Sequence, residues 1–162
     1  MLNATEPVAI GVALNLADYN ALEQSRKFES YHFCFHYCLI EAARKVSEGE
    51  TLSLVLDYRQ KTLGPAKEIL HSVKNWEDFA ERKRLGGVTS QSSKDFVPLQ
   101  AADWLSNEIF KGVYNRSSHP STKTRTAYRN LEGFLITYQC LYGETICTFF
   151  DELGSYGFKL AP

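Results

Sequence analysis

Apolar residues along the chain follow two different periods, and each period predicts one kind of element. Short runs of apolar residues predict β-strands, whereas longer stretches with apolar residues every three or four positions predict α-helices. The predicted strands are 8–16, 51–57 and 85–88, and the predicted helices are 21–48, 64–76 and 97–110. Strands and helices in this order predict an α/β fold.

Two further segments have no clear period. Residues 115–126 are rich in Ser and Thr and predict a mobile loop. The aromatic-rich end, from Tyr128, fits a helix followed by a β-like segment, but its pattern does not decide the matter. At 162 residues the chain has the length of one domain, which we assign to residues 1–162.

The predicted helix that begins near residue 97 carries a polar stripe beside its apolar one. Gln100, Asp103 and Asn107 are three and four residues apart, so they share one face of the helix. Alanine residues precede Asp103, and such small neighbours let the helix lie close to another element with the carboxylate directed at it. The alternative is that Asp103 is simply solvated, as acids on amphipathic helices usually are.

A second acid, Asp57, ends the predicted strand at 51–57. This run is almost continuously apolar, as in a strand that is covered on both faces of an α/β sheet. Ligands of open α/β sheets bind beyond the carboxyl ends of the strands, which makes Asp57 a candidate site residue. Asp57 is explained equally well as the first residue of a turn or as a helix cap.

These residues together resemble a known family. Leu54-Val55-Leu56-Asp57, the later pair Ser93-Lys94 and Leu99-Gln100-Ala101-Ala102-Asp103 are similar to the bacterial family called domain of unknown function 3800. The resemblance covers mainly residues 51–112, and it rests on a strand ending in Asp, a Ser/Lys loop and a Gln-x-x-Asp helix, in that order. It implies a ribonuclease H-like sheet flanked by helices.

The resemblance also implies a metal-dependent nuclease site. Asp57 and Asp103 would be the catalytic carboxylates that bind Mg²⁺ or Mn²⁺, and Gln100 would orient a ligand, a water molecule or the substrate. Ser93 and Lys94 would contact the substrate, with Lys94 at a phosphate. Carboxylates that hold two divalent ions about 3.5–4 Å apart are a common means of phosphodiester hydrolysis.

One part of the family pattern is missing from this sequence. The family usually opens with a strand carrying Asp-Glu-Ser, and no such motif precedes Val8. We therefore expect the chain to match the later part of the domain, without its first strands, and to be either a nuclease or a relic of one. The alternative is a non-catalytic binding or assembly protein whose exposed strand edges pair with a partner or a second copy.

Basic residues gather between Ile109 and Leu131, a segment without Asp or Glu. The Lys and Arg residues there are Lys111, Arg116, Lys123, Arg125 and Arg129. Arg116, Lys123 and Arg125 are candidate substrate-binding residues, because a basic loop can bind the phosphates of nucleic acid by releasing counterions. The segment is explained equally well as a solvated connector.

Charge and composition restrict the classes of function and the cellular location that we expect. The chain has 18 Lys and Arg against 19 Asp and Glu, so no overall charge draws it to nucleic acid or to anionic lipid. It has neither a signal-peptide pattern nor a membrane-spanning run, so we expect a cytoplasmic protein with free thiols. The residue types at His32, Cys34, His36 and Cys38 suit zinc, but neither a helix nor a strand brings all four together, so we expect them to pack in the interior.

Overall fold

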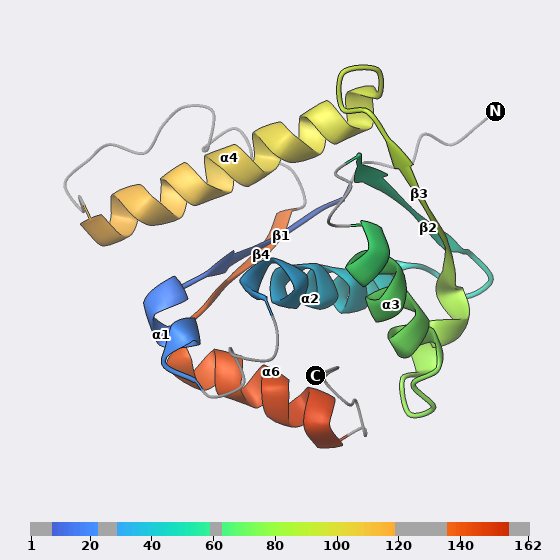
Figure 1. Ribbon diagram of the computed structural model, residues 1–162, viewed down its shortest axis with the longest axis horizontal. Helices are drawn as coiled ribbons and strands as arrows, with labels where there is room; N and C mark the ends of the chain where they lie inside the picture. The colour runs from blue at the N-terminus through green and yellow to red at the C-terminus, as the bar shows by residue number, and fades with distance from the viewer. Residues whose placement is uncertain (1–7, 23–28, 59–62, 119–135, 156–162) are drawn as a thin grey trace.

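The computed structural model describes residues 8–22, 29–58, 63–118 and 136–155, and its elements form a mixed α/β arrangement (Figure 1). In chain order the elements are β1 (Ala9–Leu14), α1 (Leu16–Asn20), α2 (Ser30–Lys45), β2 (Leu52–Asp57), α3 (Leu63–Lys74), the 3-10 helix η2 (Ala80–Arg84), β3 (Leu85–Gln91), α4 (Val97–Ser118), β4 (Ile136–Leu141) and α6 (Gly143–Ser155). The α/β class predicted from the sequence is confirmed.

One local unit of the fold consists of β2, α3 and β3. The two strands are parallel, with Leu54 opposite Val88, and α3 makes the crossover that parallel strands require. α3 is tied to β3 by a hydrogen bond of 3.1 Å that Lys74 Nζ donates to Gly86 O. The strand, helix and strand predicted for this segment are all present.

β1 and β4 form a second parallel pair, which joins the first and last described strands of the chain. Ala9 lies opposite Ile136, and Leu14 lies opposite Leu141. The ladder continues past β1, because the Asn15 N–H donates to Leu141 O at 3.1 Å. The two pairs are separate two-stranded sheets, so each described strand has one edge that pairs with no other described strand.

Helices cover both sides of the β1–β4 pair. α2 and α4 both contact β1, and they lie on opposite sides of it (Figure 1). α4 also contacts β2 and therefore reaches from one strand pair to the other. α1 and α6 pack together, with the Gly143 N–H donating to Asp18 Oδ2 at 3.1 Å, and the Tyr37 hydroxyl of α2 donates to Gln139 Oε1 of β4.

One apolar cluster joins α1, α2, α3 and α6 to both strand pairs. Its centre is aromatic: the buried ring of Phe33 on α2 lies 5.2 Å from that of Phe149 and 4.9 Å from that of Phe150, measured between ring centroids. The residues of the 64–76 segment at helical spacing are all buried: Ile69, Val73 and Trp76. Burial of these large side chains is the main source of stability that a fold of this kind has.

The helix predicted over 21–48 is shorter in the structure. α2 begins at Ser30 and ends at Lys45, after which Val46 adopts an extended conformation with ψ of 135°. Gly49, predicted to end the helix, lies instead in the following turn with φ of 87°. The start of the predicted range is not helical either, because Ala21 ends α1; residues 23–28 lie outside the described ranges.

One prediction for the later part of the chain also needs correction. α4 continues to Ser118 instead of ending at Phe110, so residues 115–118 of the predicted loop are helical, and the rest of that loop lies outside the described residues. At the end of the chain, where the sequence pattern did not decide between elements, the described residues form the strand β4 followed by the helix α6. The branched and aromatic residues at 136–141 suit a strand, and Gly143 begins an amphipathic helix.

Candidate functional site

The loop between β3 and α4, residues 92–96, connects four of the predicted site residues. The Ser93 N–H donates a hydrogen bond of 3.1 Å to Oδ1 of Asp57, the last residue of β2. The Gln100 side chain, in the first turns of α4, donates from Nε2 to Lys94 O at 3.3 Å. Because Ser93 and Lys94 are neighbours, the loop ties the end of β2 to the beginning of α4.

Local hydrogen bonds shape this loop. The Asp95 N–H donates to Ser92 O at 3.0 Å, which closes a turn, and the Lys94 N–H donates to the Ser92 hydroxyl oxygen at 3.2 Å. Ser favours such turns because its hydroxyl satisfies a nearby backbone N–H. Lys94 and Asp95 are exposed at the tip of the turn, whereas Ser93 is half-buried against Asp57.

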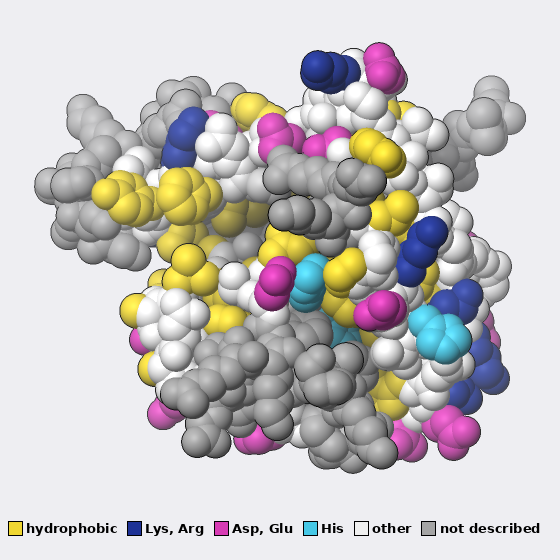
Figure 2. Space-filling model, viewed as in Figure 1, with side chains coloured by type: hydrophobic (Ala, Val, Ile, Leu, Met, Phe, Trp, Pro, Cys, Tyr) yellow, Lys and Arg dark blue, Asp and Glu magenta, His cyan; other side chains and the backbone are white. Residues whose placement is uncertain are grey.

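Asp103 lies three residues after Gln100 on α4, the helix that also contacts β2. Its side chain is exposed, and so are those of Gln100 and Asn107, so the polar stripe faces solvent. Figure 2 shows acidic side chains on the surface around the beginning of α4. Asp103 is therefore accessible to a solvated ion or to a substrate.

Asp57 and Asp103 both carry carboxylate oxygens, the kind of donor that Mg²⁺ prefers. Within the described ranges, no group of three or more His, Cys, Asp or Glu residues forms a metal site. Two cations held by a ring of acids, the arrangement that two-metal hydrolysis uses, would need more carboxylates than this pair supplies.

Other acids in the described part of the chain have different surroundings. Glu108 on α4 is 3% exposed and lies 3.8 Å from the Lys111 ammonium, so it is a buried partner of that lysine. Asp151 is exposed on α6, at the other side of the β1–β4 pair from α4 (Figure 1). Asp95 is the acid nearest in sequence to the site residues of the loop.

The predicted basic loop is only partly described. Arg116 is an exposed residue in the last turn of α4, not a loop residue, which corrects the prediction for this position. The helix extends this far because residues 111–116 contain no proline and only one glycine. Lys123 and Arg125 lie outside the described residues.

Of the four His and Cys residues on α2 that were expected in the interior, His36 is fully buried, whereas His32, Cys34 and Cys38 are half-buried. His36 is buried, its ring lies 6.0 Å from that of Phe149, and burial lowers the pKa of His36 to about 3. Burial raises the pKa of Cys34 to about 11, and burial with nearby Cys34 and Glu41 raises that of Cys38 to about 12. Both thiols therefore stay protonated at neutral pH.

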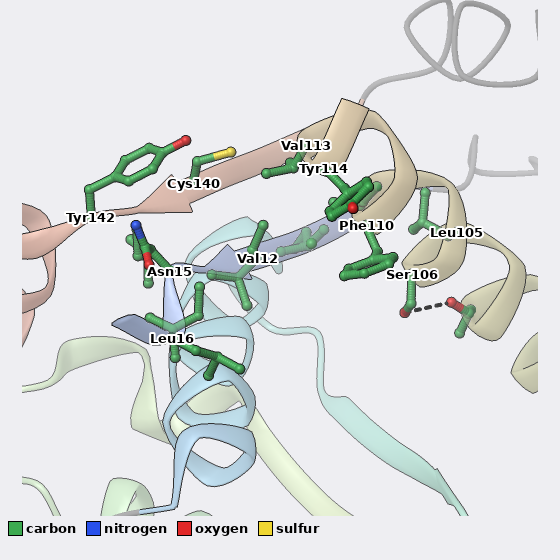
Figure 3. Close-up of a pocket in the computed structure, with 17 residues that line it drawn as sticks. Val12, Asn15, Leu16, Leu105, Ser106, Phe110, Val113, Tyr114, Cys140 and Tyr142 are labelled. Carbon is green, nitrogen blue, oxygen red and sulfur yellow. Dashed lines mark hydrogen bonds between the residues drawn. The ribbon is translucent and has the colours of Figure 1, made fainter. Parts of the chain in front are cut away.

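The sequence analysis missed a hollow of about 560 Å³ between α4 and the β1–β4 pair. Its walls include Ala102, Ser106 and Phe110 from α4 on one side and Cys140 and Tyr142 on the other (Figure 3). One signal was present in the sequence: Phe110 and Tyr114 are four residues apart on a helix and form an aromatic pair, with ring centroids 6.0 Å apart. The opposite wall was not readable, because it depends on the pairing of β1 with β4.

No described helix has both the length and the apolar character needed to cross a membrane. Comparisons with protein-family models, with curated proteins and with solved structures found no match for the chain.

Proposed function

We propose that the protein binds one Mg²⁺ or Mn²⁺ ion through Asp57 and Asp103 and hydrolyses phosphodiester bonds in nucleic acid. The observation that supports this is the loop that hydrogen-bonds to Asp57 through Ser93 and to Gln100 through Lys94. It links the strand-ending acid to the Gln-x-x-Asp helix. The ribonuclease H-like architecture is part of the same proposal, and it rests on that order of motifs.

Each residue has a distinct part in the proposed site. The backbone N–H of Ser93 orients the Asp57 carboxylate by its hydrogen bond to Oδ1. Asp103 contributes a second carboxylate from the exposed face of α4. Lys94, exposed in the same loop, attracts a phosphate by charge, and Gln100 keeps the loop next to the helix. A bound cation would polarise the phosphoryl oxygen and activate water for attack.

Metal binding is the first test of this function. Isothermal titration with MnCl₂ and MgCl₂ compares wild type with Asp57→Asn and Asp103→Asn, substitutions that keep shape and remove charge. Asp78→Asn is the matched control, because Asp78 is also an exposed Asp but lies in the turn before η2. We expect binding heat in wild type and in the control, and its loss in the two site variants. Equal heat in all four proteins, or none in wild type, contradicts the proposal.

Hydrolysis is tested separately with end-labelled single-stranded DNA and RNA in the presence of Mn²⁺. We expect cleavage products with wild type, and none with Asp103→Asn or after addition of EDTA. Metal binding without cleavage would contradict the hydrolytic part and leave a cation site that is a relic.

A second candidate function is assembly through strand edges. It is favoured by the separation of β1–β4 from β2–β3, which leaves an edge of each described strand without a described neighbour. On β1, the Asn15 N–H points to β4, so by alternation the N–H groups of Val12 and Leu14 point to the other edge. Such edges bind extended segments by backbone hydrogen bonds.

Size-exclusion chromatography coupled to light scattering tests the assembly function, because it measures the molar mass of the protein in solution. A dimer or larger species, with slow hydrogen exchange at Val12 and Leu14, supports a second copy at this edge. A monomer in which these two amides exchange much faster than those of Gly11 and Ala13, which point to β4, rules it out.

A further inference from the structure

Small residues contribute to the hollow between α4 and the β1–β4 pair. Val12 and Leu14 of β1 pack against the main apolar cluster, so by alternation Gly11 and Ala13 face the α4 side. Both contribute to the lining, and Ala102 of α4 does so from the opposite wall. These three small residues leave space between the larger side chains of the two walls, and the volume of the hollow is about 560 Å³.

Large apolar side chains gather around this hollow although they are exposed to solvent. Among the large hydrophobic residues that are exposed in the described ranges, four line it: Leu16, Phe110, Tyr114 and Tyr142. Phe110 is 65% exposed and stacks on Tyr114 at an interplanar angle of 22°. Exposed apolar groups that converge on a concavity are typical of a binding site, because scattered single residues are the norm elsewhere.

The charge of the lining residues restricts the chemical class of the ligand. The residues of the described ranges that line the hollow include no Lys, Arg, Asp, Glu or His. A charged ligand would lose hydration there without gaining an ion pair, which is costly. Asn15 supplies a polar group: its Oδ1 accepts from the backbone N–H groups of Ala17 and Asp18, so its amide is held in a fixed orientation at the edge of the hollow (Figure 3).

We propose that this hollow binds a neutral aromatic small molecule. Its volume is within the range of about 300–1,000 Å³ that ligand pockets have. The aromatic pair on α4 offers ring faces for stacking, and the Asn15 amide offers a donor for one polar group of the ligand. This inference does not depend on the proposed cation site, because neither Asp57 nor Asp103 lines the hollow.

A matched pair of fluorescent probes tests the ligand class. N-phenyl-1-naphthylamine is neutral, and 1-anilinonaphthalene-8-sulfonate has the same ring systems with an added sulfonate. We expect saturable binding of the neutral probe at one site per chain and binding of the anionic probe that is at least about tenfold weaker. Equal affinity for both probes overturns the neutral class, and no binding of the neutral probe overturns the site.

Substitutions at two neighbouring alanines locate the binding. Ala101 and Ala102 are both exposed on α4, but only Ala102 lines the hollow. Ala102→Trp should occupy the space and weaken the neutral probe about tenfold or more, whereas Ala101→Trp should leave its affinity within about twofold. If the two variants bind the probe equally well, the site lies elsewhere and the proposal fails.

A second pair of variants keeps the test informative if a new tryptophan disturbs folding. Phe110 and Trp104 are both exposed aromatic residues of α4, and only Phe110 lines the hollow. We expect Phe110→Ala to weaken the neutral probe about fivefold or more and Trp104→Ala to have little effect. Circular dichroism checks that both variants stay folded. The opposite ranking of the two variants overturns the proposal.

Discussion

The two strand pairs differ in how much of the chain lies between their members. β2 and β3 are connected by α3 and η2, whereas nearly the whole described chain separates β1 from β4. The first pair closes a short loop and can form within its own segment, but the second pair needs the intervening elements to be in place. The β1–β4 pair therefore depends on long-range packing, and the aromatic cluster between α2 and α6 provides it.

The largest expected effect comes from breaking this aromatic packing. Phe33→Ala removes a buried ring that contacts Tyr19, Phe149 and Phe150, and we expect it to lower the free energy of unfolding by about 3–5 kcal/mol. The control is Tyr31→Ala, an exposed ring on the same helix, with an expected change within about 0.5 kcal/mol. Urea unfolding followed by circular dichroism measures both. A similar loss of unfolding free energy in the two variants would show that the aromatic cluster does not stabilise the β1–β4 pair.

A smaller effect is expected from a tight contact in the β2–β3 pair. A Cβ at Gly86 would lie 2.8 Å from Thr51 Cγ2 and 3.1 Å from Leu52 O, so we expect Gly86→Ala to cost about 1–3 kcal/mol. A Cβ at Gly87, the next residue, would meet nothing within 4 Å. Gly87→Ala should therefore be neutral or stabilise by up to about 1 kcal/mol. Thermal unfolding gives the ranking, and a larger loss for Gly87→Ala would contradict the close approach of the strands.

Acid should lower the free energy of unfolding through His36, whose ring packs beside that of Phe149 in the aromatic cluster. Burial lowers the pKa of His36 from its ordinary value of 6.5 to about 3, so the unfolded chain takes up a proton first as the pH falls below 6.5. The free energy of unfolding should decrease by about 2 kcal/mol from this residue at pH 5, and the loss continues toward pH 3. Above pH 6.5 the contribution is fully present.

His36→Leu removes this ionisation and should flatten the decrease between pH 7 and pH 5 by about the same 2 kcal/mol. His71→Leu is the control, because His71 is exposed on α3. Urea unfolding at pH 7, 6 and 5 gives the comparison. A pH dependence that is unchanged in His36→Leu would mean that another group controls the acid response.

The local elements around the candidate site could be predicted from the sequence, whereas the hydrogen bonds that connect them could not. The apolar run before Asp57, the crossover helix and the Gln-x-x-Asp helix each have a period that neighbouring residues encode. The resemblance of motifs placed Ser93 and Asp57 in one expected site, but their hydrogen bond joins residues 36 positions apart, which no local period encodes. The start of α2 and the extension of α4 were missed, because the packing of a helix decides its length as much as its propensity does.

By itself, the sequence determined the α/β class, the β2–α3–β3 unit and the polar face that carries Gln100 and Asp103. Only the tertiary structure decided that β1 pairs with β4, that α4 reaches across both strand pairs, and that a hollow remains between α4 and β1–β4. The physical reason is the separation along the chain of the residues that encode each feature. Periodicity is a property of adjacent residues, whereas a strand partner and an unfilled volume depend on side chains that are far apart in the chain and meet only on folding.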